Sequence, residues 1–339
     1  MQNIKHYLNV SLKGIAMGAA DVVPGVSGGT IALITGIYQE LINSISAINF
    51  KTLMILKNEG IVAAFNAING KFLSFLVSGI LISVLSLAKL IHYLLDNEPV
   101  IIWAFFFGLI MASIWLVGKM VKEWDFITLL ALFLGTVISF GITQISPAHG
   151  PDTLWYLFLS GMLAFIAMIL PGISGSFILL LLGAYQLVLG KVSGLVDALV
   201  QGDSVLLLAS AFSLVVFVLG GITGLLSFSR ILKWMFSKYE AITLALLTGF
   251  LIGSLNKVWP WKQTLSVWYK HSGTSLEKAY PLIQHNVLPA EYSQITAAEQ
   301  QLGLLVKTPQ LTAALIYAII GFLTIIILSA VSARFKHNQ

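Results

Sequence analysis

Long apolar runs recur along the whole chain and limit what it can fold into. They occupy 8–23, 30–48, 72–95, 100–118, 126–145, 154–170, 177–190, 204–227, 240–256 and 310–332. A run of about 18 apolar residues is long enough to cross a bilayer. Only 10% of the residues are charged, whereas soluble domains carry about 25%. The chain is therefore predicted to be an all-α polytopic membrane protein, which argues against an aqueous enzyme.

The net charge argues against a nucleic-acid-binding protein, and the lack of cysteine argues against disulfides and thiolate sites. The net charge of +5 fits loops that face anionic lipid better than nucleic-acid binding, which requires clustered basic faces. The sequence has no cysteine, which excludes disulfides and thiolate sites, and its histidines lack metal-ligand spacing. We expect no catalytic residue, metal or organic cofactor. Residues 1–14 are too polar for a signal peptide, so insertion is expected to rely on the membrane segments.

An internal repeat divides the chain into two halves. Residues 24–41 read PGVSGGTIALITGIYQEL and residues 171–188 read PGISGSFILLLLGAYQLV, with nine of eighteen positions identical at an offset of 147. Further matches are Gly14/Gly161 at the same offset, and Lys89/Arg230, Gly108/Gly249 and Ser113/Ser254 at an offset of 141. Glycine, proline and serine match, and not only the residues that any two apolar helices share. We infer two repeats, residues 1–148 and 149–339.

The number of segments in each repeat sets the relative orientation of the halves. Five segments is an odd number, and so is three, the number of spans left if each opening pair is a re-entrant hairpin. The second half is therefore predicted to be inverted, as in many secondary transporters. The predicted first repeat has hairpin 8–48 and helices 72–95, 100–118 and 126–145. The second has hairpin 154–190, helices 204–227, 240–256 and 310–332, and an external loop, 257–309.

The charges indicate that both termini are cytoplasmic. In that orientation the inside receives Lys5, Lys51, Lys57, Lys119, Lys122, Arg230, Lys233, Lys238, Arg334 and Lys336. The short outside loops 96–99 and 146–153 contain no Lys or Arg, which is the positive-inside pattern. Loop 257–309 carries five lysines, but long loops escape the rule.

The first hairpin is predicted to re-enter rather than to span. Its incoming segment contains Lys13 and Asp21, and a charge at mid-bilayer costs about 3 kcal/mol or more. The apolar stretch 30–38 would cover about 14 Å, roughly half of the ~30 Å hydrocarbon core. Non-helical backbone at that depth must face protein or a wet cavity. The second hairpin is more apolar, and the sequence leaves open whether it spans or re-enters.

Each hairpin breaks at Pro-Gly-x-Ser-Gly, a pattern with the features of an anion site. Proline stops the incoming helix, and glycines leave backbone amides open to a ligand. Serine and threonine can cap the outgoing helix, whose start carries free N–H groups and partial positive charge. Such an end binds phosphate or carboxylate, and antiparallel hairpins should bring both ends to one cavity.

The candidate binding residues are Pro24, Gly25, Ser27, Gly28, Gly29, Thr30, Pro171, Gly172, Ser174, Gly175 and Ser176. A structural kink that allows close helix packing is the competing interpretation of a single copy. Two copies in antiparallel halves favour a binding site for an anion.

Five charged residues are candidates for ion coupling or for guiding a headgroup: Asp21, Lys13, Glu40, Lys89 and Arg230. Asp21 would relay a proton or cation or repel the anion in one state, and structural pairing with Lys13 is the alternative. Glu40 is a second relay candidate. For Lys89 and Arg230, snorkelling to the interface is the default role, and guidance of an anionic headgroup is the alternative.

The motifs resemble those of a known family. DVVPGVSGGTIALITGIYQEL, PGISGSFILLLLGAY and GFLIGSLNKVWPWK are similar, in order and over nearly the whole chain, to the bacterial polyprenyl-phosphate transporters, long catalogued as a domain of unknown function. The resemblance implies a flippase in the bacterial cytoplasmic membrane. Its partner would be undecaprenyl phosphate, the lipid carrier recycled in cell-wall biogenesis, returned from the outer to the inner leaflet. A proton or sodium gradient is the suspected energy source, and the oligomeric state stays open.

A second family competes for this resemblance. Undecaprenyl-diphosphate phosphatases also use inverted repeats, with a Pro-Gly-x-Ser-Arg-Ser-x-x-Thr motif and paired glutamates. Here Gly28 and Gly175 stand at the arginine position, Ala32 stands at the threonine position, and no Glu-x-x-x-Glu pair occurs. Phosphate-ester hydrolysis then lacks its cation and its acid/base pair. We therefore expect a transporter and not an enzyme. The alternatives are a phosphatase-like hydrolase and a secondary transporter of a small soluble anion.

Overall fold

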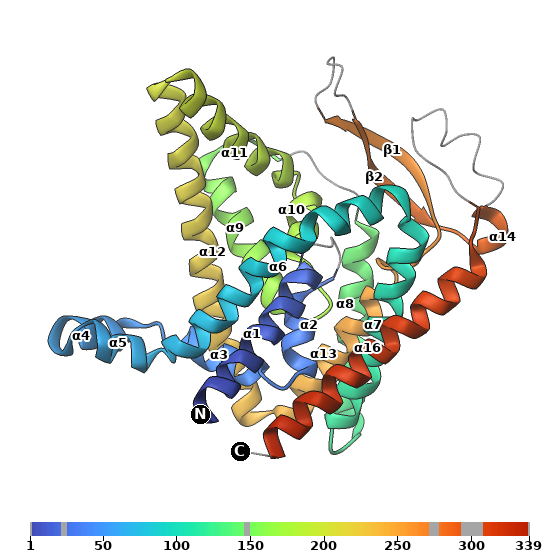
Figure 1. Ribbon diagram of the computed structural model, residues 1–339, viewed down its shortest axis with the longest axis horizontal. Coiled ribbons are helices and arrows are strands. Elements are labelled where there is room, and N and C mark those ends of the chain that lie inside the picture. The colour runs from blue at the N-terminus through green and yellow to red at the C-terminus, as the bar shows by residue number, and fades with distance from the viewer. Residues whose placement is uncertain (1, 22–25, 146–149, 271–277, 293–307, 338–339) are drawn as a thin grey trace.

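The computed structural model describes residues 2–21, 26–145, 150–270, 278–292 and 308–337. Helices make up most of this part of the chain (Figure 1). The first half contains α1 (Gln2–Asp21), α2 (Gly28–Ile34), α3 (Tyr38–Ser46), α4 (Phe50–Glu59), α5 (Ile61–Ala67), α6 (Gly70–Asn97), α7 (Pro99–Met120) and α8 (Phe126–Gln144). The second half contains α9 (Leu154–Ile169), α10 (Gly175–Leu181), α11 (Ala184–Gln201), α12 (Ser204–Lys238), α13 (Glu240–Ser254), strands β1 (Lys262–Lys270) and β2 (Lys278–Asn286), α14 (Pro289–Tyr292) and α16 (Leu311–His337).

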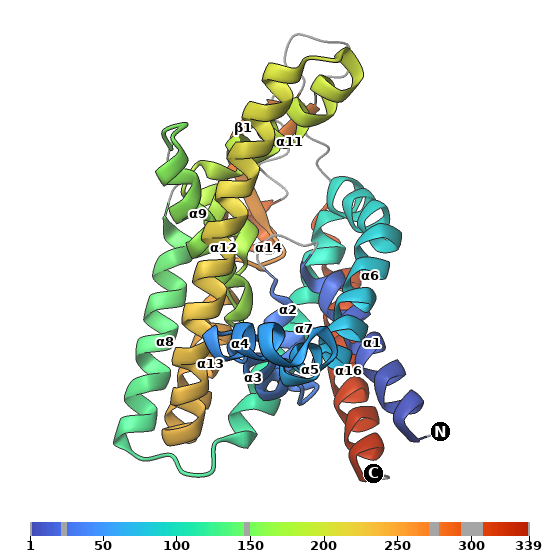
Figure 2. The same cartoon turned by 90° about the vertical axis from the view of Figure 1, so that its left-hand side faces the viewer.

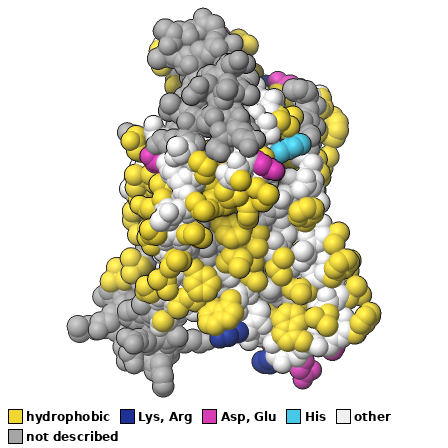
Figure 3. Space-filling view, turned by 90° about the vertical axis from the view of Figure 1, so that its right-hand side faces the viewer, with side chains coloured by type: hydrophobic (Ala, Val, Ile, Leu, Met, Phe, Trp, Pro, Cys, Tyr) yellow, Lys and Arg dark blue, Asp and Glu magenta, His cyan; other side chains and the backbone are white. Residues whose placement is uncertain are grey.

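Five described helices are long and apolar enough to cross a membrane: α6, α7, α8, α12 and α16. Helices α10 and α11 pass the same test only as a pair, bent by 104° at their junction. Figure 3 shows apolar side chains over a broad belt of one face, with Lys and Arg side chains at its lower edge. The predicted class, an all-α polytopic membrane protein, is confirmed.

Several predicted boundaries are wrong in detail. The predicted segment 30–48 is two helices, because α2 ends at a turn that contains Gly36 with φ +74°. Helix α12 continues to Lys238, eleven residues beyond its predicted end at 227. The predicted external loop 257–309 contains an antiparallel β1–β2 hairpin and α14. Helices α4 and α5 fall in a stretch to which no element was assigned.

Glycine pairs let α1 cross α6 and α9 cross α12 at close range. The pairs are Gly14 with Gly79, and Gly161 with Gly220. A Cβ on any of these four residues would lie 2.3 Å or less from a carbonyl oxygen of the facing helix. Small residues allow such close backbone approach in membrane proteins. The two crossings are therefore built from glycines that correspond at the repeat offsets of 147 and 141.

A second set of crossings joins the two halves. Gly108 of α7 faces α16, where Gly321 faces back, and Gly249 of α13 faces α8, where Gly135 faces back. A Cβ at each of these positions would again lie 2.3 Å or less from a backbone oxygen across the crossing. Each half thus packs its middle helix against the last helix of the other half.

The ends of the elements sort to two sides of the molecule. Both termini lie at one end, together with the connection between α7 and α8, and the β1–β2 hairpin lies at the other end (Figures 1 and 2). Helix α1 runs inward from the end with the termini, and α9 runs inward from the opposite end (Figure 1). The two hairpin tips therefore approach each other in the interior.

Candidate functional site

Helix α2, which follows the first break, is enclosed by protein. Every residue from Gly28 to Ile34 is buried. Its seven residues cover about 10 Å at about 1.5 Å per residue, far short of a span. The helix is therefore enclosed by protein, as a short helix at membrane depth has to be. Pro24 and Gly25 lie outside the described residues.

The two hairpin tips touch. Four hydrogen bonds join them within the described residues: Ser27 Oγ donates to Leu170 O (3.0 Å) and to Met168 O (3.3 Å), the Gly172 amide donates to Thr30 Oγ1 (3.1 Å), and the Tyr38 hydroxyl donates to Ile169 O (2.7 Å). The partners are more than 130 residues apart in sequence. The polar residues of the first motif and its following helix therefore hold the backbone of the second.

The start of α2 already holds a carboxylate. Asp21 Oδ1 accepts a hydrogen bond of 2.6 Å from the Gly28 amide, and the N-cap residue Ser27 accepts from the Gly29 amide at 3.1 Å. The expectation that these amides stand open to a ligand is wrong for this conformation. The physical reason is that a helix start attracts the protein's own anion as well as a foreign one.

Glycine at position 28 leaves room for the Asp21 carboxylate. A Cβ at position 28 would lie 2.4 Å from Asp21 Oδ2, closer than real Cβ atoms come to other atoms. The second motif has its own requirement, because Gly172 has φ +82°, a conformation that favours glycine. The tip geometry thus explains a glycine in each motif.

The start of α10 differs from that of α2. Ser174 occupies the N-cap position, but its side chain makes no capping hydrogen bond. Instead, the hydroxyls of Ser174 and Ser176 lie 2.9 Å apart. The predicted cap at Ser174 is therefore wrong, and the start of α10 lacks the side-chain cap that Ser27 supplies to α2.

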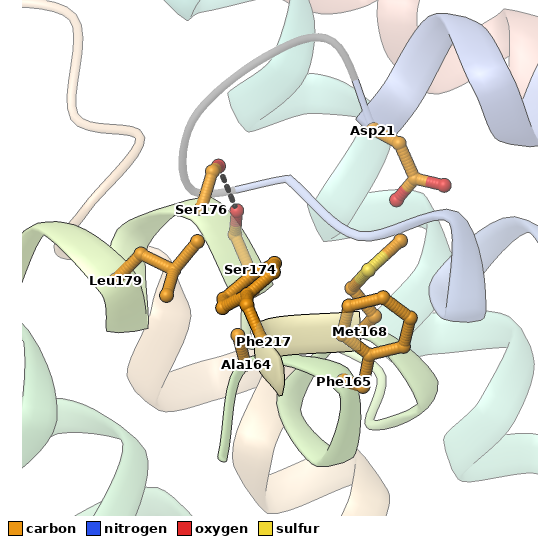
Figure 4. Close-up of a pocket in the computed structure, with 9 residues that line it drawn as sticks. Asp21, Ala164, Phe165, Met168, Ser174, Ser176, Leu179 and Phe217 are labelled. Carbon is orange, nitrogen blue, oxygen red and sulfur yellow. Dashed lines mark hydrogen bonds between the residues drawn. The ribbon is translucent and has the colours of Figure 1, made fainter. Parts of the chain in front are cut away.

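A cavity of about 220 Å³ lies beside the two tips (Figure 4). Its lining is Asp21, Ala164, Phe165, Met168, Ser174, Gly175, Ser176, Leu179 and Phe217. In Figure 4 the Asp21 carboxylate lies across the cavity from the serine pair. The polar groups are thus a carboxylate and two hydroxyls, set in an otherwise apolar wall. This arrangement can hold one small polar group while an attached apolar chain remains in apolar surroundings.

The other charged candidates contact other parts of the fold. The buried Lys13 ammonium donates to Thr35 O at 2.8 Å. Glu40 Oε1 accepts from Asn69 Nδ2 at 2.9 Å, which ties α3 to the start of α6. Arg230 lies at a different pocket. Lys89 lies on α6, and its side chain is outside the description. Of the five charged candidates, the structure places Asp21 at the tip cavity.

Two lysines of the predicted external loop lie over aromatic rings, and one of them, Lys257, is close to the second hairpin. Lys257 Nζ lies 4.1 Å from the centroid of the Phe177 ring of α10, and Lys262 Nζ lies 3.5 Å from that of Trp103. The Lys262 ammonium also donates to Lys257 O at 2.7 Å. Burial lowers the pKa of Lys257 to about 8, and burial, followed by the charge of Lys257, lowers the pKa of Lys262 well below its usual value. The stretch GFLIGSLNKVWPWK contains both lysines and was the available signal.

A metal centre finds no support in the described part of the chain. No group of three or more His, Asp or Glu side chains there lies close enough to hold an ion. The groups that the tips offer a ligand are the hydroxyls of Ser174 and Ser176 and the carboxylate of Asp21.

Comparison with known proteins identifies the family. A family model described as undecaprenyl phosphate translocase-like matches residues 17–276. The chain is 46% identical over 297 residues to the polyprenyl-phosphate transporter of Vibrio cholerae serotype O1, which covers 87% of this chain and 90% of that protein. It is 34% identical over 282 residues to the polyprenyl-phosphate transporter of Staphylococcus aureus, covering 79% and 92%. No solved structure matches. The chain belongs to the VCA0040-like family of undecaprenyl phosphate translocase-like proteins.

Proposed function

We propose that this protein is a lipid-phosphate flippase that returns undecaprenyl phosphate across the bacterial cytoplasmic membrane. Two relatives similar over most of the chain are named polyprenyl-phosphate transporters. The observation that carries the proposal for a site is the cavity beside the joined tips, with Asp21 and the Ser174–Ser176 pair facing it. The phosphate would occupy this cavity while the prenyl tail stays in lipid.

Asp21 gives the proposed site a means of coupling. A phosphate at the start of α2 would compete with the Asp21 carboxylate for the Gly28 amide. Two anions a few ångströms apart in an apolar wall repel each other strongly. The headgroup can therefore enter this position only when Asp21 swings away, takes up a proton or pairs with a cation. Protonation of Asp21 would couple transport to a proton gradient, and pairing of Asp21 with a sodium ion would couple it to a sodium gradient.

Alternating access would come from the two halves. Matching glycines form the α1–α6 and α9–α12 crossings, which supports an inverted repeat with exchangeable conformations. With both termini cytoplasmic, α1 enters from the cytoplasm and α9 from outside. The tip cavity would then open to one leaflet at a time.

The test is a leaflet-resolved flipping assay with undecaprenyl phosphate in proteoliposomes, with and without a proton or sodium gradient. We expect protein-dependent movement of the lipid between leaflets, accelerated by one of the gradients. Release of inorganic phosphate from a diphosphate lipid would instead establish a hydrolase. Uptake of a water-soluble anion without competition from the lipid would establish a small-anion transporter. An inactive, folded protein in the flipping assay would overturn the proposal.

A further inference from the structure

Two short helices form an arm at the end of the molecule that carries both termini. Helices α4 and α5 project sideways from the bundle (Figure 1), and no residue of α4 is buried. The arm exposes large apolar side chains, with Phe50 75%, Ile61 77% and Val62 75% exposed, beside the lysines of α4. Short helices of low net hydrophobicity that combine exposed apolar side chains with lysines are suited to lie in the surface of a bilayer. The arm therefore marks the level of the lipid headgroups at this end.

A pocket of about 390 Å³ lies at the root of the arm. Its lining is Ser46, Asn49, Arg230, Lys233, Trp234 and Ser237. Asn49 caps α4 by accepting from two amides at its start, which ties the pocket to the arm. None of the lining residues is acidic, and none is shared with the tip cavity. The pocket is thus a separate basic site at the level of the headgroups.

The two cations of the pocket are well placed for one anion. Arg230 and Lys233 are three residues apart on α12 and so lie on the same face of that helix. The Arg230 guanidinium donates one bond, of 3.4 Å, to Ile48 O, out of five N–H donors that such a group carries. Trp234, 51% exposed, has the amphipathic ring that is enriched at membrane interfaces.

We propose that this pocket binds the phosphate of an anionic membrane lipid in the leaflet nearest the two termini. Arginine and lysine together supply the donors and the charge that phosphate recognition needs. Basic pockets between membrane helices at a bilayer surface bind phosphate headgroups for the same reason. The ligand is either a bulk anionic phospholipid or polyprenyl phosphate, since both present the same phosphate chemistry. The site does not depend on the proposed transport function.

The pocket can be tested by photocrosslinking the full-length chain. A photoreactive residue, Ser237→p-benzoylphenylalanine, is reconstituted in vesicles of phosphatidylcholine alone, with added phosphatidylglycerol, or with added polyprenyl phosphate. Mass spectrometry of the irradiated protein then identifies the attached lipid. We expect adducts with the anionic lipids. In vesicles that contain both phosphatidylglycerol and polyprenyl phosphate, the lipid with the higher adduct yield is the preferred ligand. Equal adduct yields with phosphatidylcholine alone and with either anionic lipid would overturn the proposal.

A control variant that removes the same number of charges distinguishes binding in the pocket from attraction by the overall positive charge at this end of the protein. Arg230→Gln with Lys233→Gln should reduce the anionic adducts on the order of tenfold, because each basic residue at a bilayer surface contributes substantially to anionic lipid binding. Lys119→Gln with Lys122→Gln removes the same charge from the other side of this end and should leave the yield unchanged. Equal losses in both double variants would show a diffuse surface effect and contradict a pocket. Flipping of polyprenyl phosphate, measured on the same samples, reports separately on the transport proposal.

Discussion

The Asp21 carboxylate accepts a hydrogen bond of 2.6 Å from the Gly28 amide, at the start of a wholly buried helix. This contact places a fixed anion where helix-end electrostatics would otherwise attract a phosphate. It also explains why position 28 carries glycine, since a Cβ there would collide with the carboxylate. An internal anion that must yield to an external one is a direct way to couple headgroup binding to a cation.

Replacing Asp21 with Asn tests this coupling. Asparagine keeps an oxygen that can accept from the Gly28 amide but loses the charge, so the fold should persist. We expect flipping to lose most of its dependence on pH and on the driving gradient, with less than about a twofold change remaining across a unit of pH. The assay is flipping in proteoliposomes at several pH values. Asp152→Asn, at an exposed ion pair with Lys191, is the control, and an unchanged pH profile in Asp21→Asn would clear Asp21 of this role.

Replacing Gly28 with Ala tests the close approach itself. The added methyl group must displace the carboxylate or the helix start, which should lower stability by about 1–3 kcal/mol and slow transport. Thermal unfolding in detergent measures the first effect. Gly141→Ala, in open space on α8, is the matched control. Asp21→Ala in the Gly28→Ala background should restore stability by removing the clash; no recovery would show that the strain lies elsewhere.

The sequence predicted which residues lie at the tips, but not that the Asp21 carboxylate occupies the start of α2. Helix-end electrostatics predicted that two tips would meet around an anion, and Ser27, Thr30 and Gly172 do join the tips. The sequence did not indicate that the anion at the first tip is Asp21, because Asp21 and Gly28 are seven positions apart and belong to different helices, so no helical spacing predicts their contact. Lys257 was missed because its proximity to Phe177 depends on how α13 packs against the hairpin. Apolar periodicity predicts helices, whereas contacts between distant elements depend on tertiary packing.

Enlarging Ser174 tests whether the headgroup uses the tip cavity. Ser174→Leu fills part of a cavity of about 220 Å³ and removes a hydroxyl, so we expect at least about a tenfold loss of flipping, equivalent to roughly 1.4 kcal/mol. Expression and thermal stability should stay near wild type. Ser78→Leu, on the exposed side of α6, is the control for added bulk. Normal flipping by a folded Ser174→Leu protein would remove the tip cavity from the transport path.

The lowered pKa of Lys257 leads us to expect that flipping declines at alkaline pH. Burial lowers its pKa to about 8, so the ammonium is charged below that pH and neutral above it. If its charge draws phosphate toward the second hairpin, flipping should decline as pH rises through about 8. Lys257→Arg keeps the charge and should extend activity to higher pH, whereas Lys257→Met should be slow throughout. A decline at the same pH in Lys257→Arg would assign the limit to another group.

The absence of native cysteine makes the orientation directly testable, because any introduced cysteine is the sole thiol. Lys122→Cys lies in the α7–α8 connection, at the end with both termini, and Asp152→Cys precedes α9 at the opposite end. Both side chains are exposed, so both should react with a permeant maleimide. In intact cells an impermeant maleimide should label Asp152→Cys and spare Lys122→Cys until the membrane is opened. The reverse pattern would mean that the protein has the opposite orientation in the membrane. Labelling of both from one side would contradict α8 as a membrane crossing, since α8 is the candidate span between the two positions.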